Sequence, residues 1–126
     1  MLTTVYGIFP VRVVYVEGDV KGFAGYSWGH TIKIDRDYQN DRGLLEHELE
    51  HSRQYYRSAG LWPFLYRWSA KRRLRYELDA YAVQLRFADP ADRDRLAVKF
   101  AGFIARRYNL KDINAEETAR TLRSML

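Results

Sequence analysis

Two patterns of hydrophobic residues divide the chain near residue 40. Before that point, β-branched and aromatic residues form short runs separated by glycines, and residues 31–35 alternate between polar and apolar, which is typical of a strand with one buried face. After it, apolar residues recur every three or four positions, as they do along one side of a helix. The pattern predicts an α+β fold, in which a small, mostly antiparallel N-terminal sheet packs on a helix and a helical C-terminal part follows.

Three segments are expected to form the sheet. Residues 11–16 are rich in β-branched side chains and end at a glycine turn, while residues 22–27 and 31–35 flank the short sequence Trp28-Gly29-His30. This spacing predicts a β-hairpin connected by those three residues. We interpret His30 as an exposed residue of the turn rather than as a metal ligand, because histidines in loops are usually solvent-exposed.

Helices are predicted in the rest of the chain. The first covers residues 42–58, preceded by the capping residue Asp41 and ended by Gly60. Its residues Leu45, Leu49, Ser52 and Tyr56 form one stripe, which is expected to face the sheet. We divide the single domain, residues 1–126, into a sheet (1–40), a first helix (41–58), a second helix (70–88) and supporting helices (89–126).

The composition excludes several kinds of chemistry. A length of 126 residues suits one domain with one core. The chain has no cysteine, so a disulfide framework, a thiolate metal site and a cysteine nucleophile are excluded. The net charge of +5 permits contact with nucleic acid without requiring it. Because no signal peptide or transmembrane segment is recognisable, we expect a cytoplasmic protein with no membrane partner.

The sequence from His47 to His51, His-Glu-Leu-Glu-His, carries the strongest chemical signal. Residues four apart on a helix are separated by only ~40° around its axis and by about 6 Å along it, so both imidazoles can point toward one spot. Two neutral nitrogen ligands beside a carboxylate are typical of zinc hydrolases. We expect His47 and His51 to bind one Zn²⁺ per chain and Glu48 to lie beside the metal. The alternative is an exposed helix face with polar residues.

A third metal ligand is predicted on the second helix. Glu77 lies among Leu74, Leu78 and Tyr81 on the apolar side of that helix, where a carboxylate is costly to bury unless it is paired or binds a metal. Asp79 points to a different side, and we expect it to be solvated or to support a ligand indirectly. Glu77 is therefore the residue that completes a site with two histidines.

At His47, Glu48, His51 and Glu77 the sequence resembles the gluzincin zinc metallopeptidases, in which a glutamate on a later helix is the third ligand. The local sequence from Glu77 to Ala80, Glu-Leu-Asp-Ala, matches the Glu-x-x-Ala setting of that glutamate. The chain is also similar to the small single-domain metallopeptidase-like proteins of bacteria and bacteriophages. The resemblance therefore implies a minimal zincin-like domain.

Two departures from related families are visible. Tyr81 stands where larger relatives often have an aspartate. The extension that defines the metzincins is missing, because Gln54 and Arg57 occupy the places of its glycine and its third histidine. The resemblance is therefore to the gluzincin branch.

The resemblance implies a zinc-dependent peptidase and a role for each residue. Zinc held by His47, His51 and Glu77 would keep a fourth position for water and lower the pKa of that water toward ~7. Glu48 would accept the water proton as a general base and then deliver it to the leaving amine. The peptide or protein substrate is expected to pair with the edge of residues 31–35.

A donor that stabilises the developing oxyanion is also expected. The candidates are Tyr81, Tyr55, His30 and several arginines, and the sequence does not distinguish among them.

Two other functions stay open. A catalytically inactive zinc-binding protein would close the site with a fourth side chain, such as His30 or Asp35. A nucleic-acid-associated module would use a basic run beside aromatic residues, since both kinds of side chain contact nucleic acids. We interpret that run as a solvated helix face. Its members are Arg67, Lys71, Arg72, Arg73 and Arg75, beside Trp62, Tyr66 and Trp68.

Overall fold

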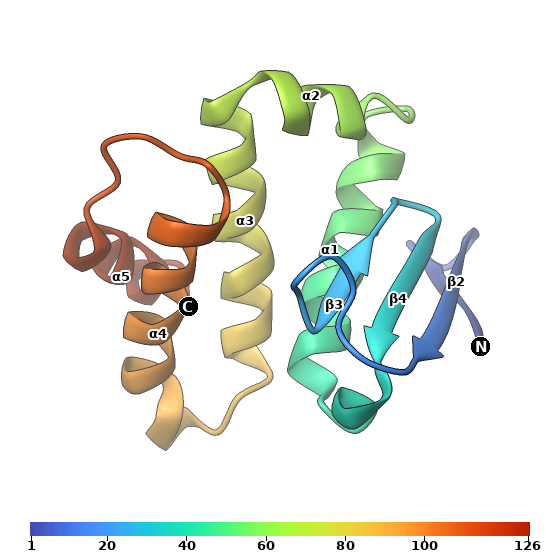
Figure 1. Cartoon of the computed structure of the whole chain (residues 1–126), viewed down its shortest axis with the longest axis horizontal. Helices are drawn as coiled ribbons and strands as arrows, with labels where there is room; N and C mark the ends of the chain where they lie inside the picture. The colour runs from blue at the N-terminus through green and yellow to red at the C-terminus, as the bar shows by residue number, and fades with distance from the viewer.

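The computed structural model describes residues 1–126 as a four-stranded sheet followed by five α-helices (Figure 1). The α+β prediction is confirmed. The strands are β1 (Leu2–Val5), β2 (Phe9–Val16), β3 (Gly25–Ser27) and β4 (Thr31–Asp35). The helices are α1 (Arg42–Arg57), α2 (Trp62–Trp68), α3 (Ala70–Arg86), α4 (Arg93–Arg107) and α5 (Ala115–Ser124), with short 3-10 helices η1 (Arg36–Tyr38) and η2 (Pro90–Asp92).

The sheet has the strand order β1-β2-β4-β3. β1 pairs with β2 and β3 with β4 in antiparallel orientation, and the second of these pairs is the predicted hairpin. β2 and β4 are parallel, and neither this pairing nor β1 is indicated by the sequence pattern. Because β4 has a neighbour on each side, the expectation that a peptide pairs with the edge of residues 31–35 is wrong. The free edge on that side of the sheet belongs to β3.

Helix α1 packs its apolar side on the sheet. Asp41 caps the helix by accepting a hydrogen bond from the Leu44 amide at 2.9 Å, in line with the predicted start. Leu49 is buried in the core formed with the sheet, and Leu45 and Tyr56 are partly buried beside it. The predicted stripe of α1 is therefore confirmed. The sheet contributes Val5, Val11, Val13, Ile32 and Ile34 to this core.

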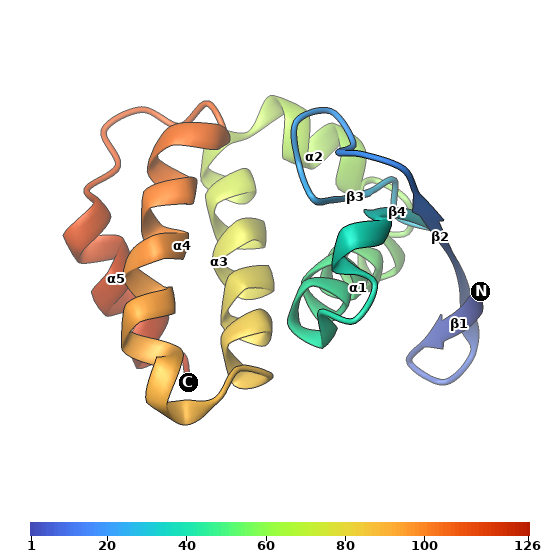
Figure 2. The ribbon, with the colours of Figure 1, turned by 60° about the horizontal axis from the view of Figure 1, so that its bottom comes forward.

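A second hydrophobic core lies among α3, α4 and α5. It includes Leu78 and Leu85 of α3, Phe100 and Ile104 of α4, and Leu122 of α5. Figure 2 shows the resulting layers, with the sheet on one side of α1 and with α4 and α5 on the far side of α3. Helices α1 and α3 therefore lie side by side between two cores, with their facing sides in the middle of the molecule.

Helix α2 connects the end of α1 to the start of α3 across one end of the pair (Figure 1). It begins with Trp62 and has Pro63 in its first turn, where a missing amide hydrogen costs nothing. Trp62 is buried, whereas Phe64 and Trp68 are exposed. None of the helices combines the length and the apolar character that a bilayer crossing needs.

Candidate metal centre

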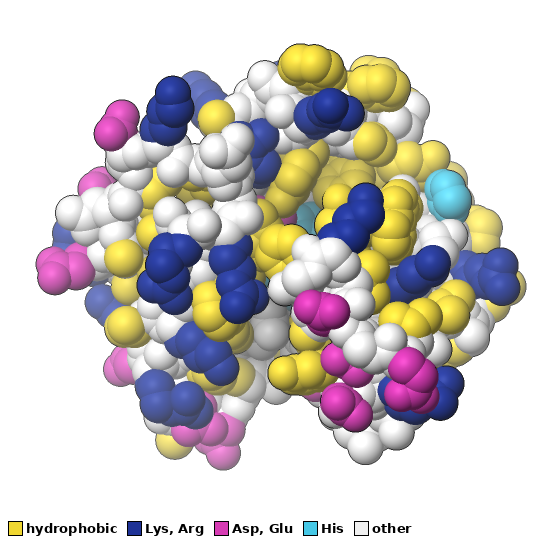
Figure 3. All heavy atoms as spheres, viewed as in Figure 1, with side chains coloured by type: hydrophobic (Ala, Val, Ile, Leu, Met, Phe, Trp, Pro, Cys, Tyr) yellow, Lys and Arg dark blue, Asp and Glu magenta, His cyan; other side chains and the backbone are white.

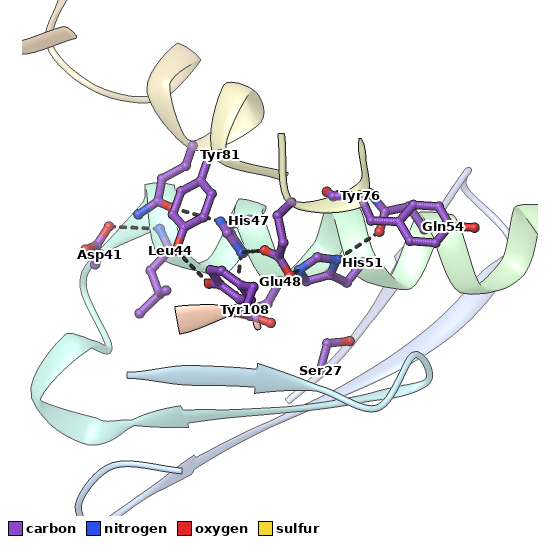
Figure 4. A network of polar contacts seen from close by, with 12 residues as sticks. Ser27, Asp41, Leu44, His47, Glu48, His51, Gln54, Tyr76, Tyr81 and Tyr108 are labelled. Atoms are coloured by element: carbon purple, nitrogen blue, oxygen red, sulfur yellow. Dashed lines mark hydrogen bonds and ion pairs between the residues drawn. The ribbon is translucent and has the colours of Figure 1, made fainter. Parts of the chain in front are cut away.

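His47 and His51 lie one turn apart on the side of α1 that faces α3 (Figure 4). Both are buried, and their ring centroids are 5.1 Å apart. Their Nε2 atoms face the carboxylate of Glu77 on α3, with 3.4 Å from His47 to Oε1 and 3.3 Å from His51 to Oε2. Potential ligand atoms of the three residues all lie within 4.8 Å of one another. The structure thus brings together the three side chains that the sequence predicts as ligands.

The surroundings of Glu77 suit a bound cation. The residue is 1% exposed, and no hydrogen-bond donor reaches its Oε1 atom. A buried carboxylate oxygen without a partner is costly, and a divalent cation shared with the two imidazoles would remove that cost. A donor set of two nitrogens and one carboxylate oxygen, without sulfur, is one that zinc accepts. The residues present therefore fit the metal.

Two glutamine side chains fix the orientation of the imidazoles. Nδ1 of His47 is 3.0 Å from Oε1 of Gln84 on α3, and Nδ1 of His51 is 2.8 Å from Oε1 of Gln54. Gln54 donates its own amide hydrogen to the Tyr76 carbonyl at 3.0 Å, so its oxygen must face the histidine. Each Nδ1–H then donates to an amide oxygen, which leaves the Nε2 lone pair free for a metal.

The sequence-based prediction does not identify these two orienting roles. The spacing holds a signal for one of them, because Gln84 follows Glu77 by seven residues and so lies on the same side of α3. Gln54 lies on α1 three residues after His51, but its role depends on a carbonyl of α3 that only the fold brings near.

Glu48 lies beside the three candidate ligands, with its Oε1 atom 3.9 Å from Nε2 of His47. Gly25 of β3 leaves room for it, since a Cβ atom at position 25 would lie 3.2 Å from Cγ of Glu48. Burial raises the pKa of Glu48 above its ordinary value of 4.5, although both histidines act in the opposite direction. A buried carboxylate with a raised pKa is suited to accept a proton.

The centre strongly favours positive charge. Burial by itself raises the pKa of Glu77, but the imidazoles of His51 and His47 lower it well below the ordinary value. Burial also disfavours the charged form of His51, yet the Glu77 carboxylate outweighs that effect and raises the pKa of His51 to about 9. A proton on His51 or a metal ion can supply the charge that Glu77 requires.

Three tyrosines surround the candidate ligands. Tyr66 of α2 donates a hydrogen bond of 2.5 Å to Oε2 of Glu77. The Tyr81 ring packs edge-on against His47 at a centroid distance of 4.4 Å, and its hydroxyl is 2.7 Å from that of Tyr108. Burial raises the pKa of all three tyrosines above the ordinary 10. Each hydroxyl therefore keeps its proton and can donate it in a hydrogen bond.

Two cavities flank His47 and Glu48. One of about 520 Å³ extends toward α2, and one of about 470 Å³ extends toward the start of α1 and the end of α3. Phe23, from the connection between β2 and β3, stacks on Tyr108 at a centroid distance of 5.7 Å, and both residues line both cavities. The candidate centre thus lies in a groove between the sheet and the C-terminal helices, crossed by this aromatic pair.

Other residues considered from the sequence lie outside the centre. His30 is exposed in the β3–β4 turn, as predicted, and Tyr55 packs against it with the rings 5.9 Å apart. Asp35 caps η1, and neither Asp35 nor His30 belongs to the group of potential ligands. Asp79 is half-buried and lies 3.3 Å from Arg75, so it is paired with an arginine rather than fully solvated.

The residues of the basic run near α2, and the aromatic residues beside it, have different roles in the structure. Arg73 is half-buried and donates to four backbone carbonyls, which ties the α2–α3 corner to the end of α4. Trp62 and Tyr66 face the candidate centre, and the Trp62 ring lies 5.3 Å from that of His51. The exposed cations that form no ion pair are Arg67, Lys71 and Arg72.

Comparison with known proteins gives no family assignment. No protein-family model, no curated protein and no solved structure matches the chain. The functional interpretation therefore depends on the geometry of His47, Glu48, His51 and Glu77.

Proposed function

We propose that the protein is a zinc-dependent peptidase of the gluzincin type. One observation carries this proposal: the Glu77 carboxylate of α3 lies opposite the Nε2 atoms of His47 and His51, with Glu48 beside them and outside the ligand group. Three protein ligands of this kind leave a coordination position for water, which distinguishes catalytic zinc sites from structural ones.

Three side chains would bind the ion, and two others would orient the ligands. His47, His51 and Glu77 would hold one zinc ion per chain, while Gln84 and Gln54 keep both Nε2 atoms directed at it. When bound, the ion supplies a Lewis acid that acidifies a water molecule and polarises a carbonyl.

Proton transfer is the role that we assign to Glu48. Its carboxylate accepts the proton of the attacking water and later delivers it to the nitrogen of the departing amine. Burial raises the pKa of Glu48, and a carboxylate with a raised pKa binds a proton more readily. This supports its role as the proton acceptor.

The hydroxyl pair of Tyr81 and Tyr108 is the favoured donor to the oxyanion. In a hydrogen-bonded pair of hydroxyls one proton stays free, and Tyr108 lines both cavities beside Glu48. Of the other candidates, Tyr55 and His30 are less suitable, because they contact each other beside the β3–β4 turn and line neither cavity. A donor of this kind stabilises charge that develops on the substrate carbonyl.

An extended peptide is the substrate form that the groove favours. β3 is an edge strand, and Ala24 O and Trp28 N are bonded to β4, so the main-chain groups of Gly25 and Ser27 face the free edge. A peptide added as a further strand would pair with these two residues. Gly25 also borders Glu48, so a peptide paired with this strand would lie beside the proposed base.

The alternatives receive less support. A closed structural zinc site needs a fourth protein ligand, and neither His30 nor Asp35 joins the group. The nucleic-acid interpretation needs free aromatic side chains beside the basic run, and two of its three aromatics, Trp62 and Tyr66, line the candidate centre instead.

The test compares Glu48→Gln with Glu46→Gln. Glu46 is also a buried glutamate of α1, but it pairs with Arg42 and Arg53 and not with the candidate ligands. Wild type and both variants are purified, their zinc content is measured, and cleavage of labelled casein and of a peptide mixture is followed. We expect Glu48→Gln to keep zinc and lose cleavage, and Glu46→Gln to keep both. Undiminished cleavage by Glu48→Gln would overturn the mechanism.

A further inference from the structure

The outer side of α2 is an apolar ridge. Leu61, Phe64 and Trp68 are 56%, 64% and 76% exposed. Their spacing of three and four residues places them within an arc of about 60° on the helix. Trp62 and Tyr66 occupy the opposite side and line the cavity of about 520 Å³. The ridge is therefore not required for the candidate centre, and within the chain nothing covers it.

The ridge lies in a segment without negative charge. Between Glu50 and Glu77 the sequence has seven arginines and lysines and no acidic residue. Arg67, Lys71 and Arg72 are exposed beside the ridge and form no ion pair. Figure 3 shows hydrophobic side chains gathered over α2 at the top of the view, with a basic side chain next to them.

The position of two of these cations is itself unfavourable for folding. Lys71 and Arg72 lie in the first turn of α3, which contains no acidic residue. The N-terminus of a helix carries partial positive charge, so basic side chains there are repelled rather than stabilised. An anionic partner would relieve this repulsion.

We propose that α2 and the first turn of α3 bind the surface of an anionic phospholipid membrane. The apolar ridge enters the region between headgroups and acyl chains, and the three unpaired cations contact lipid phosphates. A second copy of the chain is a poorer partner, because it would bring two sets of these cations together. A nucleic acid would neutralise the cations but would leave the aliphatic Leu61 without an apolar environment.

The proposed contact differs from the expectation that the protein has no membrane partner. That expectation depends only on the lack of a membrane-spanning segment, and no helix is long and apolar enough to cross a membrane. A helix that lies in the interface needs only an amphipathic surface. Because Trp62 and Tyr66 face the candidate centre, docking through α2 would place that centre about one helix diameter, ~10 Å, from the lipid surface.

Vesicle flotation tests the proposal with the full chain. Vesicles of phosphatidylcholine mixed with phosphatidylglycerol are compared with vesicles of phosphatidylcholine alone, at low and high salt. We expect binding to the anionic vesicles only, weakened by salt. The double variant Phe64→Ser/Trp68→Ser should bind roughly tenfold less tightly or worse, since it removes two large apolar groups. Lys71→Glu/Arg72→Glu should give a comparable loss.

A matched control uses equally exposed apolar residues elsewhere. Leu2→Ser/Ile8→Ser changes two side chains that are each 73% exposed on the β1–β2 hairpin, and it should bind like wild type. Circular dichroism establishes that each variant is folded. The Glu48→Gln variant should also bind like wild type, so the outcome is independent of peptidase activity.

Three results would overturn the proposal. The first is the absence of wild-type binding to anionic vesicles at low salt. The second is an equal loss in the Leu2→Ser/Ile8→Ser control. The third is that Phe64→Ser/Trp68→Ser abolishes self-association in light scattering, or binding of a single-stranded oligonucleotide, while vesicle binding is unchanged.

Discussion

His51 and Glu77 face each other across the gap between α1 and α3, with Nε2 of the histidine 3.3 Å from Oε2 of the glutamate. The two residues are 26 positions apart in the sequence (77 minus 51), and packing of the two helices brings them together. The same carboxylate accepts a hydrogen bond from Tyr66 and faces His47 with its other oxygen. Glu77 is therefore the point at which α1, α2 and α3 meet.

The first prediction concerns Glu77→Gln. The substitution keeps the size of the side chain but removes the negative charge, so zinc affinity should fall by more than the roughly 10–100-fold that loss of an orienting partner costs. Competition with a chromogenic chelator measures the affinity. Asp79→Asn, two residues away and paired with Arg75, is the control and should retain zinc. Equal affinity in Glu77→Gln and wild type would remove Glu77 from the ligand set.

The second prediction concerns the orienting glutamines. Gln84→Leu and Gln54→Leu each remove the acceptor of one Nδ1–H group, so each should weaken zinc binding about 10–100-fold. Gln39→Ala serves as the control, because Gln39 is exposed beyond η1 and contacts neither histidine. Titration calorimetry gives the affinities. If both leucine variants bound zinc as tightly as Gln39→Ala, the hydrogen bonds would have no orienting role.

The third prediction distinguishes two tyrosines. Tyr108→Phe removes a hydroxyl of the pair beside Glu48 and should lower kcat by roughly 10²–10³-fold, which is typical for loss of an oxyanion donor. Tyr55→Phe removes a hydroxyl that lies near Gly60 at the end of α1, and because Tyr55 lines neither cavity it should leave kcat unchanged. Initial rates on a single cleavable peptide measure both. A similar loss in the two variants would point to a general effect on the fold.

The fourth prediction uses Gly25→Ala. The added Cβ atom would lie 3.2 Å from Cγ of Glu48, so the carboxylate must shift by a few tenths of an ångström. Because small displacements of a catalytic group are costly, we expect kcat to fall by about tenfold or more while zinc content is unchanged. Zinc analysis and initial rates measure the two quantities. Wild-type rates in this variant would show that Glu48 does not need its observed position.

The fifth prediction is the pH dependence of stability without zinc. The pKa of His51 is raised from 6.5 to about 9, so its interaction with Glu77 stabilises the fold below pH 6.5 and is lost as the pH rises through 9. The pKa of Glu77 is lowered, so its contribution is present above pH 4.5 and is lost as the pH falls further. In EDTA the Tm should therefore decrease between pH 6.5 and 9.

Zinc should counteract this loss of stability at higher pH. The metal needs a neutral His51, so its affinity rises with pH, and the Tm difference between zinc and EDTA samples should widen from pH 6.5 to 9. Differential scanning fluorimetry at several pH values measures this difference. A difference that narrows with pH would contradict the proposed competition between zinc and the proton on His51.

The sequence predicts the local parts of this structure well. The spacing of His47 and His51 requires only a helix, and the apolar neighbours of Glu77 reveal its inward position, so the three candidate ligands are identifiable before the fold is known. The boundaries of the two helices are also close, since α1 ends at Arg57 against a predicted 58 and α3 at Arg86 against a predicted 88.

The parts that depend on distant contacts are not predictable in this way. The parallel pairing of β2 with β4, which moves the free edge to β3, depends on how the connection between β2 and β3 crosses the sheet. Periodicity likewise cannot show that Tyr66 of α2 reaches Glu77, or that Gln54 of α1 bonds to a carbonyl of α3. These contacts form only when the helices pack.

Anomalous scattering at the zinc edge, from crystals grown with zinc, would show whether an ion binds between α1 and α3. We expect one peak per chain, about 2.0–2.2 Å from Nε2 of His47, Nε2 of His51 and a carboxylate oxygen of Glu77. The absence of a peak between these residues, or a peak from which the Glu77 carboxylate is turned away, would contradict this expectation.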